Sequence, residues 1–132
     1  ASPQRWRRRP AERPVTVYVD DARIPARIGR HDTRWSHLLA DTQTELHEFA
    51  ARLGLQRRWF QDPTKVGKPR AKPGSRAAEN WHYDVTDAKR KQAITLGAVE
   101  VTWREAAGII TARYELRHPE TLDFLDIAGQ NG

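Results

Sequence analysis

Short segments along the chain predict three strands; the first is β-branched and aromatic throughout, and the second directly follows a predicted helix, as in an αβ unit. They lie at residues 15–19, 55–60 and 98–102. Residues 22–36 contain Pro25 and Gly29 and have no helical periodicity, so we expect a loop there. Residues 61–80, rich in Pro, Gly and Lys, predict a second and longer loop.

Helical periodicity is clearest after the first loop. Thr42 and Glu45 form a capping box, and the apolar positions that follow them fall on one stripe. Gly54 stands where a residue in the left-handed conformation ends a helix. These signals predict a helix over residues 42–53.

Two more helices are expected between and after the remaining strands. One begins at Asp84 or Thr86 and ends before Gly97. The other begins at a second capping box, formed by Thr102 and Glu105. The predicted order is therefore strand, helix, strand, helix, strand, helix.

This βαβαβα order is typical of a parallel sheet with right-handed crossovers and helices on both faces. A central parallel strand is buried on both faces and carries no charge in its middle, a condition that residues 15–19 meet. The other two strands contain Arg57, Arg58 or Glu100. We expect an α/β domain over residues 15–117 with a small three-stranded parallel sheet of order 2-1-3.

Composition narrows the class of protein. The chain has 132 residues, which suits one domain. It has no apolar run long enough to span a membrane, and no apolar stretch follows its basic N-terminus as in a secretory signal. The lack of cysteine excludes disulfide frameworks, thiol catalysis and thiolate metal sites. We expect a cytoplasmic protein.

The net charge of +6 is unevenly distributed. Residues 1–14 hold five arginines against one glutamate, and residues 65–76 hold five basic residues and no acid. A basic arm and a basic loop of this kind bind phosphates by charge attraction, although both are also compatible with a solvated surface. The C-terminal tail, residues 118–132, is expected to contain a short helix.

Asp20 and Asp21, here called the acidic doublet, follow the predicted central strand. Ligand sites in open α/β sheets lie beyond the carboxyl ends of the strands, where the strand order reverses. Two adjacent carboxylates repel each other unless a cation lies between them, which favours a Mg²⁺ or Mn²⁺ site. In the alternative interpretation, the doublet caps backbone amides in a turn.

The tripeptide His82-Tyr83-Asp84 is a second candidate. If it is extended, His82 and Asp84 point the same way, as in a histidine oriented by a carboxylate or a pair of metal ligands. Lys89 and Arg90 lie behind it, near the start of a helix, where they oppose the helix dipole unless an anion binds. A capping aspartate and a solvated basic face are the alternatives.

Other polar residues stand near the predicted strand ends. His37 precedes the first helix, whereas His47 lies within it beside the apolar stripe. Arg58 and Gln61, at the end of the second predicted strand, are candidates to bind a phosphate or a carboxylate. The chain has none of the glycine-rich, zinc-protease or serine-hydrolase motifs.

Three segments occur in the order VTVYVDDARIPARIGR, RWSHLLADTQTELHEFAARLGLQRRWFQ and HYDVTDAKRKQAITLGAVEVTWRE. Together they resemble a bacterial and phage family known as domain of unknown function 4031, over about residues 15–105. The resemblance implies no particular reaction. It implies that these residues occupy the family's motif positions: Asp20, Asp21, His37, Asp41, His47, Arg58, Gln61, His82, Asp84, Lys89 and Arg90.

We expect an enzyme, a metal-dependent hydrolase of a phosphate-containing substrate such as a nucleotide or nucleic acid. The acidic doublet holds the cation, and His82 or His37 transfers the proton. Arg58, Lys89 and Arg90 neutralise the phosphoryl oxygens. The alternatives are a non-catalytic nucleic-acid-binding module that uses the arm and the loop, and an interaction protein whose polar cluster is structural.

Overall fold

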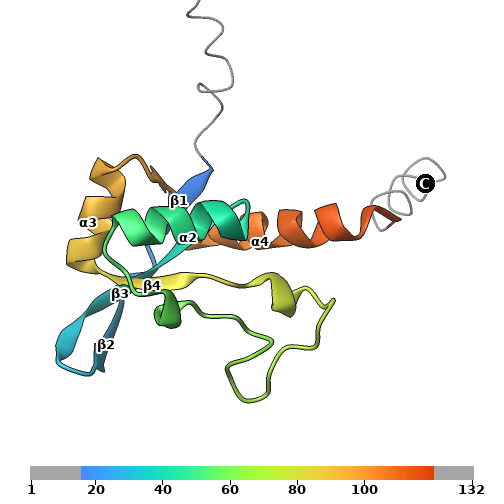
Figure 1. Cartoon of the computed structure of the whole chain (residues 1–132), viewed down its shortest axis with the longest axis horizontal. Helices are drawn as coiled ribbons and strands as arrows, with labels where there is room; N and C mark the ends of the chain where they lie inside the picture. The colour runs from blue at the N-terminus through green and yellow to red at the C-terminus, as the bar shows by residue number, and fades with distance from the viewer. Residues whose placement is uncertain (1–15, 121–132) are drawn as a thin grey trace, which may run out of the picture.

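The computed structural model describes residues 16–120, and Figure 1 shows how their elements are arranged. The predicted basic arm and the helix expected in the C-terminal tail lie outside the described residues. The strands are β1 (Val17–Val19), β2 (Ile24–Ile28), β3 (His31–Ala40), β4 (Tyr83–Thr86) and β5 (Val99–Glu100). The helices are α2 (Gln43–Arg52), α3 (Asp87–Thr95) and α4 (Trp103–Arg117), with 3-10 turns at Arg57–Trp59 and Ala77–Glu79.

The strands form one mixed sheet of five strands with β3 at its centre. Leu38 of β3 pairs with Val19 of β1 and with Tyr83 of β4, so these two strands flank β3, and both are antiparallel to it. β2 pairs with the first half of β3, and β1 and β5 form a parallel pair. The α/β class is confirmed, but the expected three-stranded parallel sheet of order 2-1-3 is wrong.

Two local predictions account for this error. Residues 22–36, expected to be a loop, contain β2 and the start of β3 as a hairpin. Pro25 is compatible with β2 because this strand pairs only with β3, and Gly29, with a φ of +62°, lies in the turn. Residues 55–60, expected to be a strand, contain a 3-10 turn instead, because β3 takes the place beside β1.

The core lies between one face of the sheet and helices α2 and α3 (Figure 1). The predicted helix over residues 42–53 is confirmed: the Thr42 hydroxyl accepts from the Glu45 amide, and Gly54 has a φ of +87°. Burial of each large aliphatic side chain stabilises the fold by about 1.5–3 kcal/mol. The main buried residues of α2 and the sheet are Leu46, Phe49, Ala50, Leu53, Val17, Val19, Leu38, Tyr83 and Val85.

The other two helices begin at caps that the sequence predicts. Thr86, rather than Asp84, caps α3. Thr102 and Glu105 form the expected capping box of α4, which extends beyond the sheet (Figure 1). Near the far end of α4, the buried Arg113 guanidinium donates to the carbonyls of Ala40, Glu79 and Trp81.

Candidate functional site

Strand register brings four polar side chains to one point of the sheet. His37 of β3 and Asp84 of β4 are paired, and His82 precedes Asp84 by two residues. Because alternate strand residues face opposite sides, all three side chains leave the face that does not pack on α2 and α3. Asp20 follows β1, and its amide donates to the His37 carbonyl over 3.0 Å.

Asp20 fixes the orientation of His37. Its side chain is 2% exposed, and its Oδ2 lies 2.7 Å from His37 Nδ1. Its Oδ1 accepts from the backbone amides of His37 and Ala22, over 2.8 and 3.2 Å. Burial raises the pKa of Asp20, but these hydrogen bonds outweigh it, so the pKa lies below its usual value. The bond to Asp20 raises the pKa of His37, against the effect of burial.

A backbone carbonyl orients His82 in the same way. Its Nδ1 lies 2.9 Å from the Asn80 oxygen, an acceptor, which assigns the proton to Nδ1. With both imidazoles held through Nδ1, the two Nε2 atoms face Asp84. Asp84 Oδ1 lies 3.3 Å from His82 Nε2 and 3.9 Å from His37 Nε2.

His37, His82 and Asp84 together are called the His–His–Asp cluster below. One ligand atom from each lies within 4.8 Å of the others, and the side chains are 33%, 14% and 35% exposed. Three acceptor atoms that face one another at this spacing can hold a divalent cation. Both histidines also donate their other ring nitrogen to an oxygen, as metal-bound histidines do.

The two members of the acidic doublet have separate partners. Asp21 Oδ1 accepts from the Trp103 amide over 2.8 Å, at the start of α4, where the helix dipole favours a negative charge. Both carboxylates of the doublet therefore accept from backbone amides, as the alternative interpretation described. Within residues 16–120, the group able to hold a metal is the His–His–Asp cluster, which includes neither of them.

The basic residues at the start of α3 bind groups within the protein. Lys89 Nζ donates over 2.7 Å to the Leu53 carbonyl, at the C-terminal end of α2. Arg90 Nε donates over 2.8 Å to the Asp20 carbonyl, and its guanidinium lies 3.3 Å from Glu100. These contacts offset the unfavourable position of cations near the start of α3, because the end of α2 is negative.

A cavity of about 490 Å³ adjoins the His–His–Asp cluster. Asp84 lines it together with Arg58, Gln61 and Lys89, so four predicted site residues share this space. Gln61 is also paired with His82, through backbone hydrogen bonds of 2.8 and 3.1 Å. The remaining lining residues include Trp35, Leu55 and Trp59.

Comparison with known families agrees with the family resemblance that we drew from the three sequence segments. The model of a family described as "Protein of unknown function (DUF4031)" matches residues 17–113. The chain belongs to the DUF4031 family. The matched range contains every residue of the His–His–Asp cluster and the acidic doublet. Comparisons of this DUF4031 chain with curated proteins and with solved structures gave no match.

Two further polar residues, His47 and Asp41, have partners away from the cluster in this DUF4031 chain. His47 Nδ1 lies 2.8 Å from the Tyr83 hydroxyl, and its Nε2 is buried with no hydrogen-bond partner among the described residues. Burial lowers the pKa of His47, with a smaller contribution from Arg57. Asp41 accepts from the Tyr18 hydroxyl over 3.1 Å.

Sequence reasoning on this DUF4031 chain missed Asn80 and the two tryptophans of the cavity. Asn80 acts through its backbone carbonyl, for which residue identity gives no signal. Trp59 is 43% exposed although it is large and apolar, and its place beside the candidate Arg58 was the available signal.

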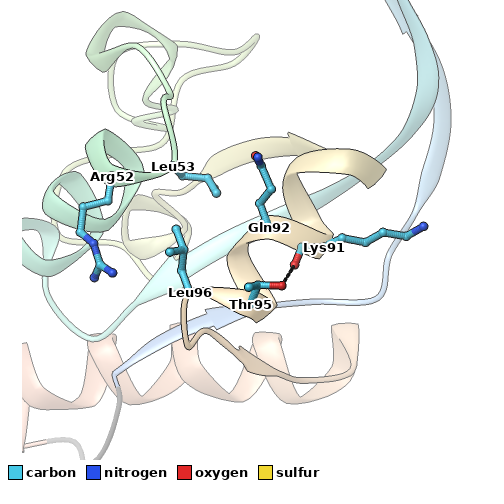
Figure 2. A pocket seen from close by; sticks show the side chains of 6 residues that line it. All are labelled: Arg52, Leu53, Lys91, Gln92, Thr95 and Leu96. Carbon is cyan, nitrogen blue, oxygen red and sulfur yellow. Dashed lines mark hydrogen bonds between the residues drawn. The ribbon is translucent and has the colours of Figure 1, made fainter.

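A second cavity, of about 400 Å³, lies between the end of α2 and the last turns of α3 (Figure 2). In it the Thr95 hydroxyl donates to the Lys91 carbonyl over 3.1 Å. Its lining contains no carboxylate or imidazole, so it offers neither metal ligands nor a general base near neutral pH.

Within residues 16–120, no helix of this DUF4031 chain has the length and apolar character needed to cross a membrane.

Proposed function

We propose that the chain is a divalent-metal-dependent hydrolase of phosphate esters, with the ion held by the His–His–Asp cluster. One observation carries the proposal. Both imidazoles are anchored through Nδ1, one by the buried Asp20 carboxylate and the other by the Asn80 carbonyl, and both direct Nε2 at Asp84. A histidine pair that served only to hold strands together would not need two oriented lone pairs beside a carboxylate.

The donor set favours one group of metals. Two imidazole nitrogens and one carboxylate oxygen suit Zn²⁺ or Mn²⁺ better than Mg²⁺, which prefers oxygen ligands. Three protein ligands leave a coordination position for water, as catalytic sites require. This set therefore replaces the acidic doublet as the proposed metal ligands, and Asp20 becomes a positioning residue behind His37.

The proposed reaction is the addition of water across a phosphate ester bond, which releases an alcohol and a phosphate. A bound divalent ion lowers the pKa of its water and so supplies the nucleophile near neutral pH. Arg58 and Lys89 line the adjoining cavity with Asp84, where they can neutralise charge on the phosphate. The partial exposure of the three ligands gives a substrate access.

Metal titration of the full chain by calorimetry tests the proposed ligands. We expect one Zn²⁺ or Mn²⁺ per chain, and more than about 100-fold weaker binding in His82→Ala, because loss of a ligand exceeds the cost of losing an outer-shell partner. His118→Ala, on the same chain but outside the cluster, is the matched control. Equal affinity in His82→Ala and the wild type contradicts the site.

The role of Asp20 is tested separately. Asp20→Asn is expected to weaken metal binding by roughly 10–100-fold, the usual effect of losing the group that orients a metal-bound histidine. Circular dichroism shows whether the variant is folded.

Hydrolysis of p-nitrophenyl phosphate and bis(p-nitrophenyl) phosphate should require the metal and stop on chelation. Turnover that survives complete metal removal contradicts the proposed reaction.

The second candidate function is nucleic-acid binding by the basic loop. Lys65, Lys68, Arg70 and Lys72 are exposed, and Arg76 anchors the loop to α4 through Thr111 and the Ala107 carbonyl. Such a surface predicts an affinity for oligonucleotides that falls steeply with salt and is independent of His82. Binding that is unchanged in a Lys68→Glu, Arg70→Glu variant contradicts it.

A further inference from the structure

We propose that the cavity beside Asp84 binds the nucleoside part of a nucleoside monophosphate, whose phosphate lies at the His–His–Asp cluster. This inference rests on the proposed function, because it gives the substrate class of the same site. It concerns a part of the molecule, the aromatic wall of the cavity, that the hydrolase proposal does not use.

The cavity and the cluster share one residue. Asp84 belongs to both, as a ligand of the cluster and as a lining residue of the cavity. Gln61 lines the cavity and is tied to His82 by two backbone hydrogen bonds. A ligand seated in the cavity therefore lies beside Asp84, the one residue of the cluster that lines it.

The walls of the cavity suit a flat aromatic group. Trp35 is held by a hydrogen bond of 3.0 Å from its Nε1 to the Ala26 carbonyl, which fixes the ring. Trp59 is 43% exposed and lines the same space. Stacking of a nucleobase on such a ring is worth about 1–3 kcal/mol per base. The volume of about 490 Å³ lies within the usual range for small-ligand pockets.

The charged residues that line the cavity favour a ligand that also carries a negative charge. Arg58 and Lys89 provide cations beside the aromatic walls. Arg58 donates to Gln56 through Nε over 2.6 Å, and a guanidinium has more donors than this one contact uses. Inorganic phosphate would leave the aromatic walls uncovered, and a free nucleobase would bring no negative charge to the two cations. A nucleoside monophosphate meets both.

The lining also favours a single nucleotide over a nucleic acid. The basic loop at residues 65–76, the part of the described chain best suited to a phosphodiester backbone, contributes no lining residue. The cavity is bounded by the β2–β3 turn at Gly29 and by the segment after α2 at Gly54 and Leu55. These boundaries enclose a small ligand on two sides.

Calorimetric titration of the metal-loaded full chain tests the inference with two phosphonate analogues, one of adenosine 5′-monophosphate (the nucleotide below) and one of ribose 5-phosphate (named below by its parent). In each a methylene group replaces the ester oxygen and prevents hydrolysis. We expect the nucleotide to bind at least tenfold more tightly, since ribose 5-phosphate lacks the base. Trp59→Ala should weaken nucleotide binding about tenfold and leave ribose 5-phosphate binding unchanged. Trp103→Ala, which removes a 58% exposed tryptophan from α4, is the matched control and should bind both ligands as the wild type does.

The outcomes separate this inference from the proposed function. If ribose 5-phosphate binds as tightly as the nucleotide, or Trp59→Ala changes neither affinity, the inference is overturned while an intact metal titration leaves the hydrolase proposal standing. If the wild type binds no metal, the proposed function fails and the inference fails with it. Tighter, strongly salt-dependent binding of a single-stranded oligonucleotide overturns the inference in favour of a nucleic-acid ligand.

Discussion

His47 illustrates at the scale of one residue how burial sets protonation in this protein. Its pKa lies below the ordinary value of 6.5, because burial and the nearby Arg57 disfavour the charged form. In the unfolded chain the same imidazole gains a proton as the pH falls through 6.5, whereas in the folded chain it stays neutral to a lower pH. The unfolded state therefore binds more protons, and the stability contributed by this residue falls as the pH drops below 6.5.

The prediction is that His47→Gln removes this pH dependence. Glutamine retains a polar group for the Tyr83 hydroxyl but does not titrate. Urea unfolding between pH 7.5 and 5 should show the free energy of unfolding of the wild type falling more than that of His47→Gln. A constant difference between the two proteins across this range contradicts the assignment.

The polar residues themselves could be selected from the sequence, but their partners could not. The two-residue spacing of His82 and Asp84 predicted that they point the same way, and the distance of 3.3 Å between His82 Nε2 and Asp84 Oδ1 agrees with it. The pairing of His37 with Asp84 depends on strand register across 47 positions of chain, which no local pattern specifies. For the same reason, the sequence assigned Asp20 to a metal rather than to the ring of His37.

At the scale of elements, the ends of helices were predictable from the sequence, and the pairing of strands was not. Helix ends depend on a few neighbouring residues, and Thr42, Gly54 and Thr102 mark them correctly. Strand neighbours depend on pairing between distant segments. Pro25 and Gly29 are residues that usually interrupt a strand, so the hairpin of β2 and β3 was predicted to be a loop. Because β3 is the central strand, missing it made the predicted strand order wrong.

Two glycines give a matched prediction about helix ends and interiors. Gly54→Ala should destabilise the protein by about 1–2 kcal/mol, because an alanine at a φ of +87° is in the left-handed region. Gly108→Ala, inside α4 with open space around the new methyl group, should stabilise it by about 0.5–1 kcal/mol. Thermal and chemical unfolding measure both, and the same sign for the two substitutions would contradict the argument.

At the scale of the whole molecule, Arg113 joins α4 to the sheet and to the segment that leads into the cluster. It is 5% exposed, and its guanidinium lies 3.3 Å from the centre of the Trp81 ring. Burial lowers its pKa to about 10, so it remains charged at neutral pH. The carbonyls that it binds come from β3 and from the residues just before His82.

Replacement of Arg113 should therefore affect distant parts of the fold together. Arg113→Met leaves three carbonyls without this donor, at about 1–3 kcal/mol for each buried unsatisfied group, so we expect a loss of at least about 3 kcal/mol. Arg104→Met, at an exposed position on the same helix, should change stability by less than about 0.5 kcal/mol. Chemical denaturation compares them, and a loss below 1 kcal/mol for Arg113→Met (roughly the effect of an average substitution) would mean that this arginine does not join α4 to the sheet.

The proposed metal site is tested most directly by crystals of the full chain grown with Zn²⁺ or Mn²⁺, using anomalous diffraction at the absorption edge of the metal. The account predicts one dominant peak about 2.0–2.2 Å from Nε2 of His37, Nε2 of His82 and a carboxylate oxygen of Asp84. It also predicts that both Nδ1 atoms keep their bonds to Asp20 and to the Asn80 carbonyl. A dominant peak between Asp20 and Asp21, or none at the cluster under saturating metal, would contradict it.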